Sequence, residues 1–349
     1  MRQREQIKAK FFSWTVLAVF AQAALIWPAT GDGGRVVAQE NDPPNPPVIF
    51  LHYDYMIGAD GHSHEPSEEA IQMVHQAFAG HGIVLIIDPV HVAIPEHKTM
   101  VFGETGAVCS NVPDPVLFRD LKASYFSPHG QVPWHYTIFG HYLALAQSCD
   151  LGYSLSGSAD LPGFDFAVAL GLSSELIGHT LPIWEADVLM HELGHNLNLQ
   201  HGGGDPVDYK PNYLSVMNDA FVFTGILQGE SPGSTTIVGR RADYSGQKLD
   251  TLNEFHLDER IGINSGTSEI TLFSDDFIVH RGSGTGPIDW NFDGVINSDV
   301  AVNINQSSYE SFPRLEERLD GYNDWEHIRA WLNLPAYRMG LLRRGGAVR

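Results

Sequence analysis

The stretch WEADVLMHELGHNLNLQH, Trp184–His201, decides both the fold class and the chemistry that this sequence predicts. Within it, His191 and His195 are four residues apart, so on a helix their imidazoles face the same way. Glu192 follows the first histidine, and His201 lies six residues beyond the second. Two imidazoles at helical spacing can share one metal ion while the neighbouring carboxylate acts on water. A straight helix would carry His201 away from them, so we expect the chain to turn first.

The apolar residues of the same stretch lie on the other face of the predicted helix. They recur at spacings of three and four residues: Ala186, Leu189, Leu193 and Leu197. On a helical wheel they fall roughly opposite His191 and His195. One face of the helix is therefore predicted to be core and the other to hold the metal.

Three nitrogen ligands that leave a fourth position open are typical of a catalytic zinc site. We therefore expect the three histidines to bind Zn²⁺, with Glu192 as the general base that takes a proton from water. The first alternative is a set of buried structural histidines. A rival zinc scheme takes its third ligand from a later acid, Glu254 or Glu259. The presence of His201 favours the three-histidine set.

The segment HELGHNLNLQHGG, residues 191–203, resembles the extended zinc signature HExxHxxGxxH of the metzincin metallopeptidases, particularly of secreted bacterial and archaeal zinc proteases with HGG. That family carries a methionine-containing turn beneath the metal, and Met217 in KPNYLSVMN, sixteen residues after His201, matches such a Met-turn. The resemblance implies a metzincin-like zinc protease fold of the α/β class. It implies a twisted mixed sheet packed on the active-site helix, with a turn-rich C-terminal part.

One position departs from that signature, because Asn198 stands where the family has glycine. Glycine serves there because the helix ends and the backbone turns left-handed, and asparagine is the next most tolerant residue. The family also has an antiparallel edge strand at the rim of its cleft, and GFDFAVAL, residues 163–170, is our candidate. A substrate chain would pair with that strand. The alternative is an ordinary core strand.

The order strand, helix, strand near the start of the chain indicates an α/β layer. Val48–Leu51 and Ile83–Ile87 are predicted strands, and the continuous apolar run of the second indicates a buried strand. Between them, a helix begins at Ser67 and ends near Gly80. Further ranges follow from the same patterns: helices over 134–149 and 310–334, and loop-rich segments over 88–132 and 202–290.

The first forty residues have the composition of an export signal. Basic residues precede a mostly apolar run from Phe11 to Trp27, and small residues suit cleavage after Ala38 or after Ala23. The alternative is an uncleaved anchor, but seventeen residues are short for a membrane span. We predict a secreted protein, extracellular or periplasmic, without stable membrane association. The predicted organisation is a signal peptide (1–38), a linker (39–47), a metzincin-like catalytic domain (48–265) and an acidic C-terminal part (266–349).

The charge of the chain excludes one class of partner. The sequence carries 21 basic and 42 acidic side chains, and without residues 1–38 the balance is 16 to 40, a net charge of −24. Such a surface repels nucleic acid and anionic lipid. The protease resemblance and the candidate edge strand instead imply a polypeptide substrate. The alternatives are a surface-binding protein with a relic zinc site, which would have lost Glu192, and a zinc hydrolase of a non-peptide bond.

The segment DWNFDGVINSD resembles a calcium loop in its spacing of oxygen ligands. Asp289, Asn291 and Asp293 match the first positions of such a loop, and Asp299 lies one residue before the position of the closing acid. We expect a compact calcium turn there. The alternative is an Asx-rich surface turn.

Two cysteines and the remaining histidines complete the prediction. In an exported chain, Cys109 and Cys149 are expected to form one disulfide, and the alternative is a pair of buried thiols. The other histidines, His62 and His64 among them, are expected to be exposed.

Overall fold

The computed structural model describes residues 46–103, 109, 111–128, 130, 132–146, 156–172, 174, 181–275, 278–305, 315–316, 318–340 and 347–348. The predicted signal peptide, most of the predicted linker and Cys149 lie outside these residues, so the inferences drawn from them stay predictions. No helix in the described ranges combines the length and apolarity that a membrane span requires.

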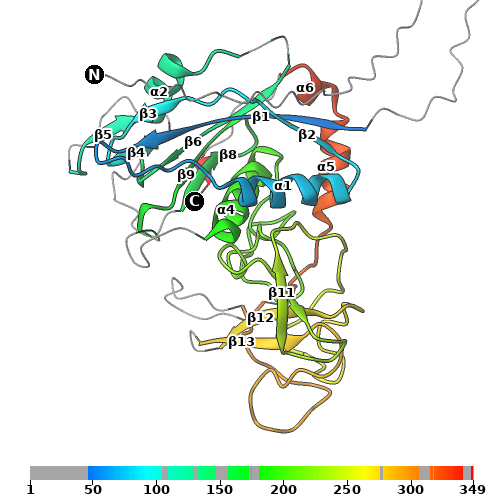
Figure 1. Ribbon diagram of the computed structural model, residues 1–349. Coiled ribbons are helices and arrows are strands. Elements are labelled where there is room, and N and C mark those ends of the chain that lie inside the picture. The colour runs from blue at the N-terminus through cyan, green and yellow to red at the C-terminus, as the bar shows by residue number, and fades with distance from the viewer. Residues whose placement is uncertain are drawn as a thin grey trace, which may run out of the picture. The chain divides into compact units, whose positions relative to one another are not determined.

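A seven-stranded mixed sheet is the centre of the fold (Figure 1). Its strands lie in the order β14-β8-β9-β6-β1-β2, and β3 also pairs with β1. The strands β1, β2, β3, β6 and β9 are parallel, whereas β8 is antiparallel to β9 and β14 is antiparallel to β8. Their bounds are β1 (Val48–Ile57), β2 (Val84–Ile87), β3 (Ala93–Pro95), β6 (Trp134–Gly140), β8 (Gly157–Asp160), β9 (Asp165–Ala169) and β14 (Ala347–Val348). A mixed sheet in an α/β chain agrees with the expected fold class.

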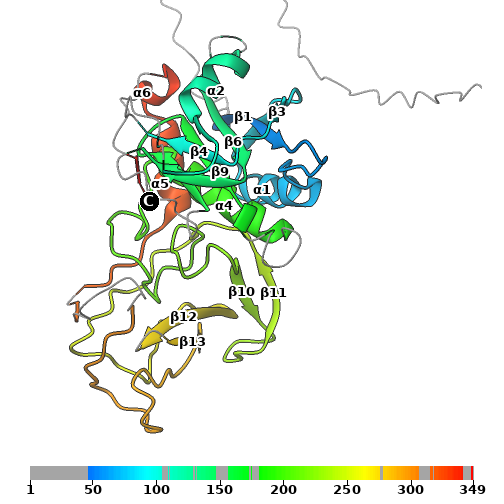
Figure 2. The same cartoon turned by 90° about the vertical axis from the view of Figure 1, so that its left-hand side faces the viewer.

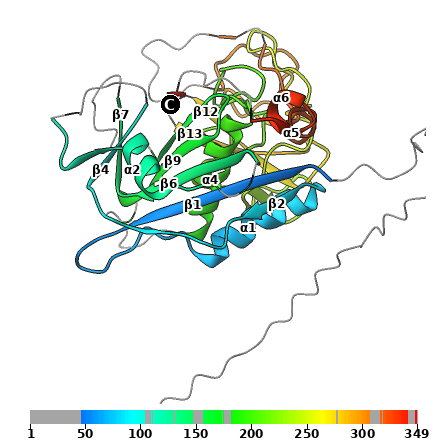
Figure 3. The ribbon, with the colours of Figure 1, turned by 90° about the horizontal axis from the view of Figure 1, so that it is seen from above.

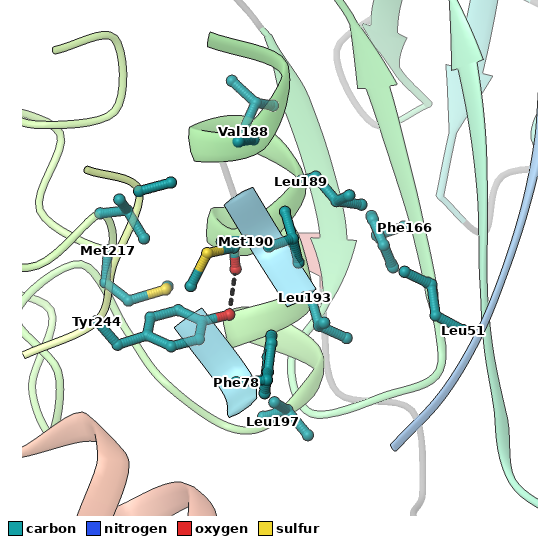
Figure 4. Packing of buried hydrophobic residues seen from close by; sticks show 14 of the residues in the cluster. Leu51, Phe78, Phe166, Val188, Leu189, Met190, Leu193, Leu197, Met217 and Tyr244 are labelled. Atoms are coloured by element: carbon teal, nitrogen blue, oxygen red, sulfur yellow. Dashed lines mark hydrogen bonds between the residues drawn. The ribbon is translucent and has the colours of Figure 1, made fainter. Parts of the chain in front are cut away.

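Helices α1 (Glu68–Gly80) and α4 (Pro182–Asn196) pack together against one face of this sheet, and β1, β6 and β9 pass over α4 when seen from above (Figure 3). Leu189 and Leu193 of α4 face Phe166 of β9 and Leu51 of β1 in the core between them (Figure 4). Burial of each such side chain contributes about 1.5–3 kcal/mol. The four residues that the helical wheel assigned to the core all lie in it: Ala186, Leu189, Leu193 and Leu197.

The start of α1 is tied to the start of α4. Ser67 caps α1, since its hydroxyl oxygen accepts a hydrogen bond from the backbone N–H of Ala70 at 3.2 Å. The same hydroxyl donates to Glu185 of α4 at 2.6 Å. The predicted start of this helix is confirmed. The prediction that the following strand is buried is wrong, because β2 lies at the sheet edge, with Val84 and Ile86 about 40% exposed.

The opposite face of the sheet carries a second layer. A parallel three-stranded sheet lies there, of order β5-β4-β7, together with α2; the bounds are β4 (Thr99–Phe102), β5 (Pro115–Leu117), β7 (Tyr142–Leu145) and α2 (Phe118–Tyr125). Phe166 of β9 points to α4, whereas Ala167 points into this second core. The helix predicted over 134–149 is therefore wrong, because its described residues form β6 and β7. A strand buried on both faces has no alternation to distinguish it from a helix.

The segment predicted to be loop-rich after His201 contains a four-stranded antiparallel sheet of order β11-β10-β12-β13 (Figure 2). Its strands are β10 (Ile226–Gly229), β11 (Ile237–Arg241), β12 (Glu269–Asp275) and β13 (Ile278–Ser283). Long turns separate them, which explains why the sequence suggested loops. A core of its own holds this sheet, with Trp290, Phe273 and Ile304 almost fully buried.

The C-terminal helices are α5 (Asp324–Leu332) and α6 (Pro335–Arg338), so only part of the predicted 310–334 helix forms. Trp325, Ile328 and Leu332 of α5 pack in the same core as α1 and α4. Residues Asn45–Arg349 accordingly form one compact unit, and the predicted boundary at residue 265 stays a prediction.

One buried carboxylate joins α5 to the chain before Met217. Asp324 is fully buried and accepts hydrogen bonds from the Tyr213 hydroxyl at 2.8 Å and the Ser215 hydroxyl at 2.6 Å. It also accepts the backbone N–H of Ser245 at 3.0 Å. A buried carboxylate with several donors loses much stability when it is removed, because those donors are left unpaired. Asp324 therefore fixes the segment that leads into the predicted Met-turn.

Replacing Asp324 with alanine is expected to lower the free energy of unfolding by on the order of 3 kcal/mol, because three buried donors lose their acceptor. Urea unfolding with zinc present measures the loss. Asp299→Ala is the control, since Asp299 is exposed and pairs, among the described residues, with the exposed His256 at 2.9 Å. Removing that pair is expected to cost less than about 1 kcal/mol. Equal losses in the two variants would contradict the anchoring role.

Candidate metal centre

The structure brings together the three histidines that the sequence singled out. His191 and His195 lie one turn apart on α4, and His201 reaches them from the loop beyond the helix. One nitrogen from each ring lies within 4.8 Å of the other two, and the Nε2 atoms of His191 and His195 are 3.1 Å apart. Tetrahedral zinc with Zn–N bonds of 2.0–2.1 Å would separate its nitrogens by about 3.3 Å. The spacing therefore suits a shared ion.

Hydrogen bonds behind the rings fix their orientation. Nδ1 of His191 lies 2.7 Å from the Val216 carbonyl oxygen, and Nδ1 of His195 lies 2.8 Å from that of Leu199. A carbonyl oxygen only accepts, so both Nδ1 atoms carry the proton. In a neutral ring the Nε2 atom then has only its lone pair. Two lone pairs facing each other at 3.1 Å repel unless a cation lies between them.

Burial keeps these two rings neutral. Burial lowers the pKa of His191 to about 4, with a further contribution from the charge of His201, and burial lowers that of His195 well below its usual value. For His201, burial also lowers the pKa, but the hydrogen bond to Asp208 and the nearby charges of Asp219 and Glu192 outweigh it and raise the pKa to about 9. The acidic groups around His201 therefore stabilise a positive charge at this position. The neutral rings of His191 and His195 offer the lone pairs of their Nε2 atoms.

Glu192 lies beside the histidines and is 4% exposed. In the part of the chain that the structure describes, its Oε2 atom and Nε2 of His201 have no hydrogen-bond partner. Burial raises the pKa of Glu192 well above its usual value, and the charge of His201 opposes that shift. Its other oxygen lies against β8, because a Cβ atom on Gly157 would fall 2.3 Å from Oε1. Glycine at that position leaves room for the carboxylate.

Met217 packs beneath the metal-binding turn of α4. It is fully buried, and it follows Val216, whose carbonyl orients His191. A Cβ atom on Gly194 would lie 2.2 Å from the Met217 sulfur, so this helical glycine permits the close approach. Tyr244 lies beside Met217 and donates its hydroxyl to the carbonyl of Met190 at 2.5 Å (Figure 4). The methionine therefore packs against the turn of α4 that carries the two histidines, and its role as a Met-turn stays a prediction.

The turn to His201 uses a left-handed residue. Asn198 has a φ angle of 70°, and its N–H donates to the His195 carbonyl at 2.9 Å. After His201, the buried ammonium group of Lys210 donates to the carbonyls of Gly202 at 2.8 Å and Asp320 at 2.6 Å. The helix thus ends between His195 and His201, as the six-residue spacing of these two histidines requires. The buried Lys210 then holds the loop that follows.

The glycines after His201 have a packing role. The ring of Tyr322 lies against them, because Cβ atoms on Gly203 and Gly204 would fall 2.6 and 2.5 Å from it. Larger residues would push the His201 loop away from α4. Within the HGG motif, Tyr322 explains Gly203, whereas a Cβ atom on Gly202 would fall 2.3 Å from Oδ1 of Asp205.

The rival zinc scheme is wrong, because Glu254 and Glu259 bind backbone groups elsewhere. Glu254 accepts hydrogen bonds from the N–H groups of Ile304 and Glu316, each at 2.6 Å. Glu259 accepts them from Trp290 and Asn297, each at 2.8 Å. Each carboxylate joins two loops next to the core of the four-stranded sheet, so neither is available as the third ligand of the metal. The sequence offered no way to distinguish such a role from metal binding.

The predicted calcium turn is not supported. The carboxylates of Asp289, Asp293 and Asp299 do not gather within 4.8 Å of one another. Asp289 accepts the N–H of Gly294 at 2.9 Å, Asn291 accepts that of Asp293 at 3.1 Å, and Asp299 pairs with His256. Local backbone bonds of this kind are those of an Asx-rich turn, which was the alternative.

The candidate rim strand lies inside the sheet. Residues 163–170 contain β9, which pairs with β6 on one side and β8 on the other. The interpretation as a core strand is therefore the right one. β8 is the strand that borders Glu192, through Gly157.

The cysteine prediction concerns Cys109 and Cys149. Cys109 is buried in a small core with Val101, Leu117 and Ala144. Cys149 lies outside the described residues, so the disulfide stays a prediction.

The expectation that His62 and His64 are exposed is only half right. His62 is 37% exposed, but His64 is 10% exposed and lies with Glu96 and His141 in a group of ligand atoms within 4.8 Å of one another. The sequence signal for this group was the His62-x-His64 spacing alone, since Glu96 and His141 lie far away in the chain.

No protein-family model and no curated protein matches the chain. Among solved structures it is similar to archaemetzincin from Methanopyrus kandleri, at 16% identity and a TM-score of 0.29, over 50% of this chain and 83% of that one. A likeness this weak carries no argument about function. The functional case therefore rests on the geometry of this chain's own residues.

Replacing Asn198 with glycine is expected to preserve stability and activity, because glycine adopts a φ of 70° with less strain. Asn198→Ala is the matched variant and is expected to be on the order of 1 kcal/mol less stable than Asn198→Gly. Thermal unfolding with zinc present compares the two. In a regular helix the order would reverse, because alanine is the better helix former by about 1 kcal/mol. An alanine variant more stable than the glycine variant would contradict the left-handed turn.

Proposed function

We propose that this protein is a secreted zinc-dependent endopeptidase, with His191, His195 and His201 as zinc ligands and Glu192 as general base. The observation that carries the proposal is the pair of neutral imidazoles whose Nε2 lone pairs face each other at 3.1 Å, beside a buried carboxylate oxygen without a partner. Three histidines suit Zn²⁺, whose catalytic sites take three protein ligands and keep one position open.

Zinc, when bound, supplies a Lewis acid that polarises a carbonyl group and makes water more acidic. The chain supplies the proton transfers. Glu192 accepts a proton from the attacking water and returns it to the leaving amine. The carboxylate is buried, and its Oε2 atom has no hydrogen-bond partner among the described residues, so it is available to a water molecule. Gly157 leaves the space that the carboxylate occupies.

A polypeptide substrate is favoured by the strand next to Glu192. The outer edge of β8 pairs with β14, with Ala347 opposite Asp160 and Val348 opposite Ala159. This edge of β8 therefore accepts an extended chain in antiparallel pairing, only two residues from Gly157. A substrate that replaced β14 would pass close to Glu192. Recognition by backbone pairing selects for polypeptide over other substrates.

Secretion is proposed from the sequence of residues 1–38. A protein recovered from the medium or periplasm is expected to begin at Gln39, as its intact mass would show. A full-length chain retained in the cell would contradict the export signal.

Replacing Glu192 with glutamine is expected to lower the hydrolysis of an unfolded protein substrate by about 10²–10⁴-fold, because the general base is lost. The zinc content is expected to stay unchanged, since Glu192 is not a ligand. His201→Ala should lower zinc affinity and activity together. His75→Ala, at an exposed position of α1, is the control. Activity of Glu192→Gln within tenfold of the wild type would contradict its catalytic role, and unchanged zinc affinity in His201→Ala would contradict the ligand set.

Ending the chain at Gly340 is expected to raise kcat/KM for a peptide substrate roughly threefold to tenfold, because a substrate no longer displaces β14 from β8. The effect should appear mainly in KM. The control is a chain in which 341–349 are replaced by a Gly-Ser sequence of equal length. That chain can still pair through its backbone and should stay nearer the wild type. An unchanged KM in a folded, truncated protein would show that substrate binds elsewhere.

A further inference from the structure

A second group of metal-binding side chains lies apart from the catalytic histidines: His62, His64, Glu96 and His141. Oε1 of Glu96 is 2.8 Å from Nε2 of His62, 3.0 Å from Nε2 of His64 and 3.3 Å from Nδ1 of His141. The nitrogens of His64 and His141 are themselves 3.3 Å apart. These four separations are near the edge length of a zinc tetrahedron, about 3.3 Å, and all four ligand atoms lie within 4.8 Å of one another.

The sheet topology explains why residues so far apart in sequence meet. Glu96 follows β3, His141 follows β6, and His62 and His64 belong to the turn after β1. β3 and β6 are both parallel to β1, so the carboxyl ends of these three strands lie at the same edge of the sheet. The turn after β1 folds back, since the N–H of His64 donates to the Met56 carbonyl at 2.9 Å. The site is therefore fixed by sheet pairing.

Hydrogen bonding alone is a poor account of this arrangement. If all three imidazoles donated to Oε1 of Glu96, their N–H groups would converge on one oxygen, and those of His64 and His141 would lie 3.3 Å apart. Side chains of His64, Glu96 and His141 are at most 10% exposed, so water does little to relieve that crowding. A divalent cation bound by the same four atoms removes the conflict, because it accepts the three lone pairs and the carboxylate charge together.

We propose that His62, His64, Glu96 and His141 bind a second zinc ion, in a closed structural site. Four protein ligands leave no open position for water, which distinguishes a structural from a catalytic site. Three nitrogens and one oxygen also suit the borderline character of Zn²⁺ better than that of calcium or magnesium.

The surroundings of the four ligands support the site. Nδ1 of His62 contacts Asp60, at 2.5 Å from Oδ1, which leaves Nε2 for the metal. The other oxygen of Glu96 lies 3.6 Å from the ammonium group of Lys98, which leaves Oε1 for the metal. Gly58 and Gly171 lie against the rings of His62 and His141, where Cβ atoms would fall 2.3 and 2.7 Å from ring carbons. Both glycines therefore leave room for the ligands.

The position of the ion suggests what it stabilises. The turn that carries His62 and His64 leads directly to Ser67, the cap of α1 that also donates to Glu185 on α4. An ion at this place fastens the ends of β1, β3 and β6 to the loop that positions the starts of α1 and α4. It would thus hold the active-site helix against the sheet without touching substrate.

Counting zinc tests the proposal. The full chain, stripped with a chelator, reloaded with zinc and desalted, is expected to hold two zinc ions by elemental analysis, one for each histidine group. His191→Ala/His195→Ala should retain one ion, and His64→Ala/His141→Ala should also retain one. The variant with all four changes should retain none, and His75→Ala, an exposed histidine, should retain both. A His191→Ala/His195→Ala variant with no zinc, or a His64→Ala/His141→Ala variant with as much zinc as the wild type, would overturn the second site.

Two further measurements decide the matter if the His64→Ala/His141→Ala variant does not fold. In the His191→Ala/His195→Ala variant, a chelator should lower the melting temperature, since the remaining ion binds only the folded chain. Cobalt in that variant should give the visible absorption bands of a tetrahedral site, and Glu96→Gln should shift them. An unchanged melting temperature, or no cobalt bands, would overturn the site. Bands that Glu96→Gln leaves unchanged would remove Glu96 from the ligand set.

Discussion

The acceptors behind the three histidines determine which way the imidazoles point, and much of the surrounding structure serves to place those acceptors. The Val216 carbonyl behind His191 belongs to the turn that contains Met217, and the Leu199 carbonyl behind His195 follows the left-handed residue Asn198. Because a carbonyl oxygen can only accept, it commits Nδ1 to carry the proton and Nε2 to offer a lone pair. A displaced carbonyl would release the ring, so the geometry of two short turns sets the chemistry of the site.

The C-terminal part of the chain supports these turns. Asp324 holds the hydroxyls of Tyr213 and Ser215, and Lys210 joins Gly202 to the Asp320 carbonyl. Near the core of the four-stranded sheet, the buried Glu254 and Glu259 each use both carboxylate oxygens to bind backbone N–H groups of loops. A protein with so many long turns needs such acceptors, because the buried N–H groups of loops have no strand or helix partner. Several of its many acidic side chains are therefore structural.

The sequence predicted best what depends on neighbours along one helix. The spacing of His191 and His195, the apolar face of α4 and the turn at Asn198 are all local, so the structure has them where they were expected. The sequence was a poor guide to features that depend on contacts between segments far apart in the chain. β6 and β7 were mistaken for a helix because both their faces are buried, and the ligand group around Glu96 needs three parallel strands to assemble it. Likewise, nothing in a buried glutamate reveals whether it holds a metal or two N–H groups.

The residues that hold the His201 loop in place come late in the sequence, which affects when the site can form during synthesis. The three histidines are complete at residue 201, but the Asp320 carbonyl, the Tyr322 ring and Asp324 come more than a hundred residues later. A nascent chain on the ribosome therefore contains all three histidines long before it has the contacts that position His201. Non-local contacts of this kind also form late in folding. The geometry of the three-histidine group is consequently complete only after synthesis has passed residue 324.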